Sequence, residues 1–460
     1  MFIQQLYTKC LSEAAYYVES NGEAAVIDPL RDIDAYLELA KERNATIKYI
    51  FETHFHADFV SGHLDLAKVT GAPIIYGPNA TTKFPIRKTS DGEIIPLGEL
   101  CFEVLHTPGH TLESTCYLLK DATGKPLCVF TGDTLFVGDV GRPDLAQKGI
   151  DLTMEDLAGM LYDSIQRKLM PLSDEVTVYP AHGPGSACGK SLGPNTFSTI
   201  GDEKATNYAM KATSKAEFIK QVTDGIAPPP QYFPINARIN KEGYDPLDAV
   251  IEKGMQSLSV TDFKSAIREN TILLDTRPAT EFTSGFVPGS ISIGLEGRFA
   301  EWAGGLLPFD APMLLITEKG KEKESIVRLA RVGFDKIEGH LQGGYEAWVN
   351  AGEEIDLIID VEADELLMDL PHDPNLIVVD VRKESEFETD HLKEAVNMPL
   401  NGLTDPGSMA NIEDHQNLYI HCAGGYRSVI AASLFKRQGF HQIRNVLGGW
   451  SAISKLRVEG

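Results

Sequence analysis

The sequence predicts an α/β protein of several domains. Its 460 residues are enough for about three domains. Strand-like and helical segments alternate from the N-terminus to about Leu172, and a second strand-and-helix pattern is repeated within residues 256–460. We therefore expect domains at 1–255, 256–355 and 356–460.

Composition excludes several classes of protein. A net charge of −24 argues against nucleic acid or an anionic membrane surface as a partner. No run reaches the ~18 apolar residues that a membrane span needs. The N-terminus has no basic region followed by an apolar core, so no signal peptide is expected. The six cysteines lie far apart without CxxC spacing, which favours reduced thiols in a cytoplasm.

The first elements follow from turn and periodicity signals. Leu6 to Ile27 is predicted to form strands around the turn Ser20-Asn21-Gly22, because Asn-Gly favours a hairpin. Asp32 to Arg43 has helical spacing, with Asp32 as the predicted N-cap.

The next strand leads into a stretch of metal-binding residue types. Strand Ile47–Glu52 is followed by His54, His56 and Asp58 at alternating positions, which an extended segment directs to one side. Imidazole and carboxylate are the ligands that borderline divalent metals take. Taken alone, so short a motif is equally compatible with a solvated loop.

Three later strands end in further candidate ligands. His110, Asp133 and His182 each follow a strand-like run beside Gly or Pro, where a turn directs a side chain into a shared cleft. This ordered set, over roughly residues 1–200, resembles the metallo-β-lactamase superfamily. The resemblance implies two sheets sandwiched between helices and a metal site.

One departure from the superfamily pattern indicates the subtype. Dinuclear zinc hydrolases of the superfamily, such as glyoxalase II, carry a histidine directly after Asp58, whereas this chain has Phe59, which cannot bind a metal. Its Gly-Arg-x-Asp segment, Gly141–Asp144, resembles that of the persulfide dioxygenases, which use one iron. The resemblance implies one Fe(II) per chain, held by His54, His110 and Asp133.

Other residues are predicted to support this site. His56, Asp58 and His182 are expected to orient the ligands or contact the substrate. Arg142 and Cys188 are expected to line the substrate pocket. Cys188 lies on a Gly-rich loop six positions after His182, where its thiol could carry a persulfide or could simply fill a small buried space.

Periodicity weakens between about Lys204 and Gly254, a stretch that contains Pro228-Pro229-Pro230. It could be a linker. Its aromatic residues favour a segment packed on the first domain; they are Phe218, Tyr232, Phe233 and Tyr244.

The C-terminal region contains two copies of one unit. Asp275 matches Asp380 and Gly343 matches Gly448, both at an offset of 105 positions. Both copies resemble rhodanese domains, which are small doubly wound α/β sheets. Asp380 and Arg382 are predicted to pair and hold the fold.

The second copy carries the loop Cys422-Ala-Gly-Gly-Tyr-Arg-Ser, which is similar to the rhodanese active-site loop. Backbone N–H groups and the start of a helix there would stabilise a thiolate, a persulfide, sulfite or thiosulfate. Cys422 is the predicted nucleophile, Gly424 and Gly425 let the backbone curl, and Arg427 adds charge. In the first copy, Thr317 stands in place of Cys422, so we expect that copy to be inactive.

The whole chain resembles the fused persulfide dioxygenase–sulfurtransferases of bacterial sulfide detoxification. The resemblance implies that a small persulfide and O2 give sulfite, and that sulfur transfer through Cys422 interconverts sulfite plus persulfide with thiosulfate. The thiol carrier remains open among glutathione, coenzyme A and inorganic sulfide, and a homo-oligomer is expected. Two alternatives are a zinc glyoxalase II-like thioester hydrolase fused to a sulfurtransferase, and a non-catalytic persulfide relay or sensor.

Overall fold

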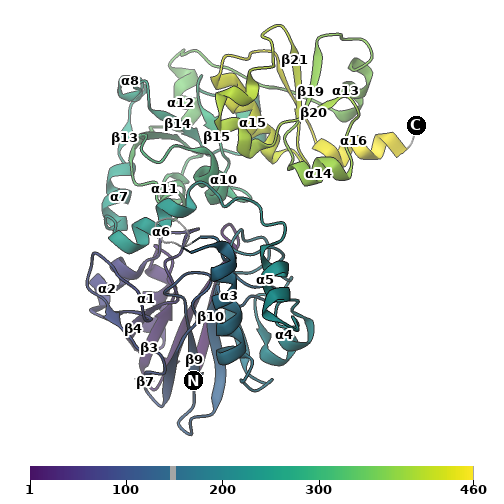
Figure 1. The fold of residues 1–460 in the computed structure, drawn as a ribbon. Coiled ribbons are helices and arrows are strands. Elements are labelled where there is room, and N and C mark those ends of the chain that lie inside the picture. The colour runs from purple at the N-terminus through teal and green to yellow at the C-terminus, as the bar shows by residue number, and fades with distance from the viewer. Residues whose placement is uncertain (146–151, 459–460) are drawn as a thin grey trace. The chain divides into compact units, whose positions relative to one another are not determined.

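The computed structural model describes residues 1–145 and 152–458. The chain divides into two compact units, one of residues 1–247 with 330–333 and one formed by the rest (Figure 1). Both units combine sheets with covering helices, so the predicted α/β multi-domain class is confirmed. None of the described helices combines the length and apolar character that a bilayer crossing requires.

The first unit contains two six-stranded sheets. The first sheet has the order β1-β2-β3-β4-β5-β6, with strands at Phe2–Thr8, Glu13–Ser20, Glu23–Ile27, Thr46–Glu52, Ile74–Tyr76 and Arg87–Lys88. The second has the order β12-β11-β10-β9-β8-β7, with β7 to β12 at Ile94–Leu97, Leu100–His106, Thr115–Lys120, Pro126–Gly132, Thr177–Pro180 and Ser198–Thr199.

The two sheets face each other across an apolar core. Phe51 of the first sheet packs against Phe102 and Tyr117 of the second, with ring centroids 4.7 and 4.6 Å apart, and all three side chains are fully buried. Helices α1 (Asp34–Glu42) and α2 (His63–Thr70) pack on the outer side of the first sheet. The predicted sandwich of two sheets between helices is confirmed.

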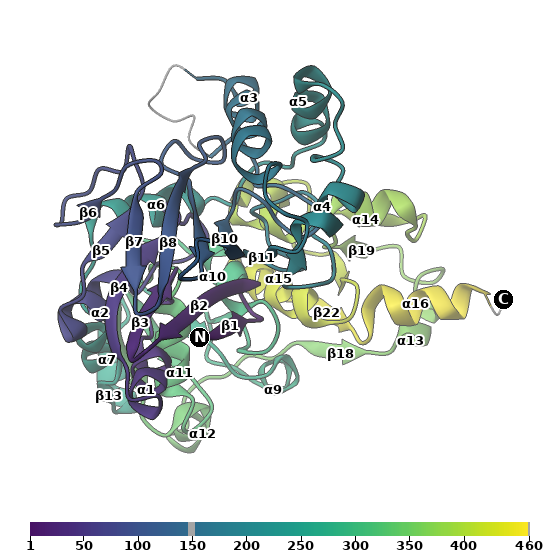
Figure 2. The same cartoon turned by 90° about the horizontal axis from the view of Figure 1, so that it is seen from below.

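Helices α3 (Met154–Ser164) and α5 (Lys215–Thr223) cover the second sheet and lie side by side in both views (Figures 1 and 2). A π-helical turn, Ile165–Leu169, extends α3. Three further helices follow: α4 (Ile200–Thr206), α6 (Phe233–Glu242) and α7 (Leu247–Gly254). Phe218, Tyr232 and Phe233 are at most 2% exposed. The stretch from Lys204 therefore contains helices with buried aromatic side chains, and the linker alternative is wrong.

Local signals near the N-terminus were partly correct. Asn21 and Gly22 have φ values of 53° and 76°, so the Asn-Gly hairpin turn between β2 and β3 is confirmed. Helix α1, however, begins at Asp34 behind Ile33, with no side-chain cap. The prediction of Asp32 as N-cap was wrong because the helix starts two residues later.

The second unit contains two five-stranded parallel sheets of the same strand order, as a doubly wound repeat requires. The first has the order β13-β17-β16-β14-β15, with β13 to β17 at Ser257–Leu258, Ile272–Asp275, Ile291–Ser292, Met313–Ile316 and Ile337–Leu341. The second has the order β18-β22-β21-β19-β20, with β18 to β22 at Ile359–Val361, Leu376–Asp380, Ala395–Asn397, Asn417–His421 and Ile443–Val446.

Helices connect these strands, and a last helix follows β22. They are α8 (Val260–Ala266), α9 (Ala279–Ser284), α10 (Phe299–Leu306), α11 (Glu322–Ala330), α12 (Gly344–Asn350), α13 (Ala363–Asp369), α14 (Glu384–Thr389), α15 (Tyr426–Arg437) and α16 (Gly449–Val458), with 3₁₀ turns at Leu400–Thr404 and Pro406–Met409. The predicted pair of Asp380 and Arg382 is present in the second copy. The Arg382 guanidinium donates to both carboxylate oxygens of buried Asp380 at 2.6–3.0 Å.

Candidate metal centre and cysteine loop

Loops at the ends of β4, β8 and β10 bring together His54, His110 and Asp133. Their candidate ligand atoms lie within 4.8 Å of one another, and all three residues are at most 2% exposed. Oδ2 of Asp133 is 3.4 Å from Nε2 of His110 and 3.7 Å from Nε2 of His54. The three residues form one buried group, as the strand-end argument requires.

Hydrogen bonds behind the two imidazoles determine which nitrogen faces the group. Nδ1 of His110 lies 2.9 Å from the Arg142 carbonyl oxygen, so that nitrogen donates. The Thr53 hydroxyl donates its hydrogen to Asp28 at 2.8 Å, and its oxygen therefore accepts from Nδ1 of His54 at 2.9 Å. Both Nε2 atoms keep a lone pair directed at Asp133, which is the arrangement of metal-binding histidines.

Electrostatics agree with neutral ligands. Burial and the neighbouring imidazoles lower the pKa of His54 well below its ordinary value. Nε2 of His110 and both carboxylate oxygens of Asp133 have no hydrogen-bond partner among the described residues. Each such buried atom costs about 1–3 kcal/mol unless it is paired. A divalent cation would satisfy all of them, so the residues present fit a metal ion.

A second group adjoins the first through Asp133. Nε2 of His182 is 3.4 Å from Oδ1 of Asp133 and 3.5 Å from Oδ2 of Asp58. The thiol of Cys188 is also grouped with Asp133 and His182, within 4.8 Å. Burial raises the pKa of the Cys188 thiol well above its ordinary value, and the nearby Asp58 and Asp133 carboxylates raise it further. The thiol is buried beside the candidate metal centre, with 1% of its residue exposed.

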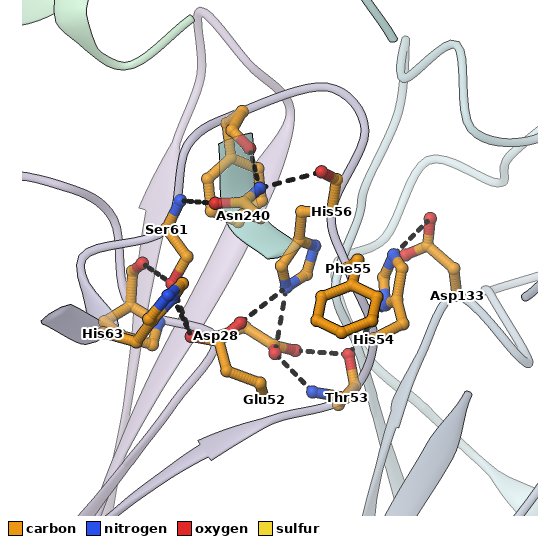
Figure 3. Close-up of polar contacts among 12 residues, drawn as sticks. Asp28, Glu52, Thr53, His54, Phe55, His56, Ser61, His63, Asp133 and Asn240 are labelled. Carbon is orange, nitrogen blue, oxygen red and sulfur yellow. Dashed lines mark hydrogen bonds and ion pairs between the residues drawn. The ribbon is translucent and has the colours of Figure 1, made fainter. Parts of the chain in front are cut away.

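His56 connects the metal region with a pair of acids behind it (Figure 3). Its Nε2 lies 3.0 Å from Oδ1 of Asp28 and 3.6 Å from Oε2 of Glu52. Burial alone would lower the pKa of His56, but the charge and hydrogen bond of Asp28, together with Glu52, raise it to about 10. His56 also belongs to a potential ligand group with Asp58 and His182. The ring of Phe59 packs on the His56 ring at 4.3 Å.

Two important residues were not singled out from the sequence. Asp28 follows a strand beside Pro29, the same signal that identified the other strand-end residues, and it could have been found. Asn240 of α6 carried no such signal. Its amide donates to the carbonyl oxygens of His56 and Phe59 at 2.8 and 2.7 Å and accepts from the Ser61 N–H at 2.9 Å (Figure 3).

Arg142 is braced and not open to solvent. Its guanidinium forms two bonds to the Asp144 carboxylate, at 2.7 and 2.8 Å, and donates to the carbonyl oxygens of Ala187 and Ala227 at 3.1 and 2.6 Å. Its N–H donates to the Cys188 carbonyl oxygen at 2.9 Å. Arg142 is only 6% exposed, and its backbone and side chain connect His110 with the loop of Ala187 and Cys188.

In the second unit, Cys422 directly follows β21 and opens the short loop that leads to α15 at Tyr426. The Gly425 N–H points at its sulfur from 3.1 Å, and Gly425 has a φ of 110°, which favours glycine. Arg427 donates to both carboxylate oxygens of Glu386, at 2.7 and 2.9 Å, so its charge is shared with that carboxylate. The hydrogen bonds from Arg427 hold the pKa of Glu386 at about 2, although burial opposes them. Thr317, after β16, offers no thiol.

Comparisons with known proteins agree with this architecture. Residues 8–182 match the family model of the metallo-beta-lactamase superfamily, and residues 259–351 and 362–456 match the rhodanese-like domain. The chain is 33% identical to a crystal structure of a metallo-beta-lactamase from Staphylococcus aureus subsp. aureus COL, with a TM-score of 0.67, covering 74% of this chain and 99% of that one. The protein thus carries a metallo-β-lactamase superfamily domain followed by two rhodanese-like domains.

Further likenesses cover about half of this chain. Hydroxyacylglutathione hydrolase GloC of Haemophilus influenzae is 27% identical over 218 residues, 43% of this chain and 91% of that protein. The chain spans only 60–61% of the length of two other hydroxyacylglutathione hydrolases that it matches. The crystal structure of ETHE1 from Myxococcus xanthus is 31% identical, with a TM-score of 0.45, covering 52% of this chain and 98% of that one.

Proposed function

We propose that the protein is a persulfide dioxygenase coupled to a sulfurtransferase. In this proposal residues 1–255 oxidise a small persulfide with O2 to sulfite, residues 256–355 are an inactive rhodanese-like domain, and residues 356–460 transfer sulfur. One Fe(II) per chain is held by His54, His110 and Asp133. The persulfide is that of glutathione, coenzyme A or inorganic sulfide.

The observation that carries the proposal is the buried ring of Phe59 beside the candidate centre. Phe59 is fully buried and lies on His56, directly after Asp58, where zinc hydrolases of the superfamily have a histidine. A phenyl ring offers no lone pair, which favours one metal ion over two. Fe(II) held by two histidines and one carboxylate would supply the activation of O2 and of the substrate sulfur.

The chain's own residues then perform defined tasks. The Arg142 carbonyl and the Thr53 hydroxyl hold the two imidazoles in the tautomer that presents Nε2. Asp133, His54 and His110 are at most 2% exposed, so bulk water is kept from the reacting sulfur. The buried Cys188 thiol, grouped with Asp133 and His182 within 4.8 Å, adjoins the ligand that would face the reacting sulfur.

Sulfur transfer follows from the geometry of Cys422. Its thiolate attacks the sulfane sulfur of a persulfide, a new S–S bond forms, and the original thiol leaves with the electron pair of the broken S–S bond. Sulfite then attacks the outer sulfur of the Cys422 persulfide and leaves as thiosulfate, which restores the thiolate. The Gly425 N–H, 3.1 Å from Sγ, stabilises the negative sulfur throughout.

The decisive experiment combines oxygen uptake with metal analysis of the same purified protein, given glutathione persulfide. Uptake by protein that contains iron, together with its loss in Asp133→Ala, would support the dioxygenase. Cys422→Ser is expected to abolish thiosulfate formation and leave oxygen uptake unchanged. Equal loss of both activities in Cys422→Ser would contradict the two-site proposal.

A zinc thioester hydrolase fused to a sulfurtransferase is the second candidate, favoured by the hydroxyacylglutathione hydrolases among the relatives. It predicts two zinc ions and hydrolysis of a glutathione thioester without oxygen uptake. Persulfide binding without either turnover would instead indicate a relay or sensor.

A further inference from the structure

Helix α15, which begins directly after the Cys422 loop, is enclosed on every side. Its residues Ser428 to Phe435 form a run of eight consecutive buried positions. At 3.6 residues per turn, such a run covers more than two turns. A helix that packs only on its own sheet leaves an outward face exposed. Something besides the sheet of its own domain must therefore cover α15.

The covering element is the first rhodanese-like domain of the same unit. The Ser292 N–H, on edge strand β15 of that domain, donates to the Ser433 hydroxyl of α15 at 3.0 Å. The Tyr426 hydroxyl, at the start of α15, donates to the Gly294 carbonyl oxygen at 2.8 Å. Tyr426 and Ser433 are seven positions apart and so lie on one face of the helix. Two hydrogen bonds along that face dock α15 on the neighbouring domain.

Tyr426 belongs to the sulfur-transfer loop itself. It follows Gly425, whose N–H lies 3.1 Å from the Cys422 sulfur. Burial raises the pKa of Tyr426, so the hydroxyl remains a donor at any physiological pH. The equivalent position in the first copy, 105 residues earlier, is Lys321, which pairs with Glu324 on the surface. A docking tyrosine therefore occurs only in the copy that has the thiol.

We infer that the first rhodanese-like domain, which lacks a thiol, is a positioning element of the second domain's sulfur-transfer site. Its Gly294 carbonyl holds the Tyr426 hydroxyl, and Tyr426 holds the loop in the conformation that directs the Gly425 N–H at Cys422. Tyr426 is a positioning residue. The inference rests on the proposed sulfur transfer at Cys422, and it gives the inactive copy a role in that reaction.

The test is Tyr426→Phe in the full-length protein, which keeps the ring and removes the hydroxyl. Its matched control is Tyr419→Phe on β21, which removes a hydroxyl bonded at 2.5 Å to Asp369 within the second domain. Two quantities are measured for each: kcat/KM for sulfur transfer from thiosulfate to a reduced thiol, and amide hydrogen exchange of residues 422–427. Thermal unfolding shows whether each variant is folded.

Tyr426→Phe is expected to lower kcat/KM about two- to tenfold, the size of one neutral hydrogen bond, and to speed exchange at the Gly425 amide. Tyr419→Phe should change neither. Wild-type exchange and kcat/KM in folded Tyr426→Phe would overturn the inference, as would equal effects in both variants. If the wild-type protein transfers no sulfur, the proposed function fails, and the exchange of the Gly425 amide still decides the positioning role.

Discussion

Replacing Asn240 by alanine is predicted to loosen the loop that carries His56 and Phe59. Asn240 lies 184 positions from His56 along the chain and is fully buried. Its side chain satisfies three backbone groups of that loop, namely the carbonyl oxygens of His56 and Phe59 and the N–H of Ser61. No other residue of α6 makes a described hydrogen bond to this loop. Alanine at position 240 therefore leaves all three backbone groups without the hydrogen bond that Asn240 makes to them.

The magnitude follows from these three bonds. Each buried group left unpaired costs about 1–3 kcal/mol, and partial relaxation makes the sum about 3–5 kcal/mol. For a unit of this size, 1 kcal/mol corresponds to a shift of about 2–4 °C, so the unfolding midpoint should fall by about 10 °C. Asn240→Asp should be at least as damaging, because an acceptor oxygen would then face two carbonyl oxygens.

The assay is calorimetric unfolding of the full chain together with metal content. Asn236 of the same helix provides the control, since it is also fully buried but its amide has no hydrogen-bond partner among the described residues. Asn236→Ala should therefore stay near the wild-type midpoint and retain the metal. Equal unfolding midpoints for Asn240→Ala and Asn236→Ala would show that the three hydrogen bonds of Asn240 do not stabilise the loop of His56 and Phe59.

Three further predictions concern other sites. Phe59→His adds an imidazole beside His56, which forms a potential ligand group with Asp58 and His182, so metal analysis should find more metal per chain and oxygen uptake should fall. Unchanged metal content would contradict the role given to Phe59. In the folded state Arg427 lowers the pKa of Glu386 from its ordinary 4.5 to about 2. The stabilisation from the Glu386–Arg427 pair is therefore complete above pH 4.5 and is lost as the pH falls toward 2. Urea unfolding should thus show Glu386→Gln less stable than wild type at pH 7, with the difference shrinking at pH 3, and a constant difference would argue against the pair. Thr317→Ala should alter neither oxygen uptake nor thiosulfate formation, and loss of either would give the first copy an active role at that loop.

Much of the fold could be predicted because its signals are local. The Asn21-Gly22 turn, the strand ends before His54 and Asp133, and the offset between the two copies all depend on short-range backbone preferences or on repetition. Period-2 and period-3.6 patterns survive in a single sequence because each residue's exposure is set by its own strand or helix. The prediction of Asp32 as N-cap was wrong because the exact start of a helix depends on the path of the preceding loop and not on the helix alone.

The candidate site was predictable only as a set of residue types at strand ends. Which residues lie behind them could not be predicted, because the partners come from distant parts of the chain. Asn240 reaches the loop of His56 from a helix that the sequence left ambiguous. Arg142 was expected to line the substrate pocket and Arg427 to add positive charge to the cysteine loop. In the folded chain, Arg142 is paired with Asp144 and Arg427 with Glu386.

The sequence by itself determined the order of strands and helices, the tandem repeat and the candidate residues His54, Asp133 and Cys422 at strand ends, because periodicity and turn chemistry act over a few residues. The two-sheet sandwich was predicted only through the resemblance to a known superfamily. Only the tertiary structure decided that His56 pairs with the carboxylates of Asp28 and Glu52, that the Cys188 thiol lies buried beside Asp133, and that Tyr426 docks on Gly294. Such contacts join segments far apart in the chain, and their geometry exists only once the sheets and helices have packed.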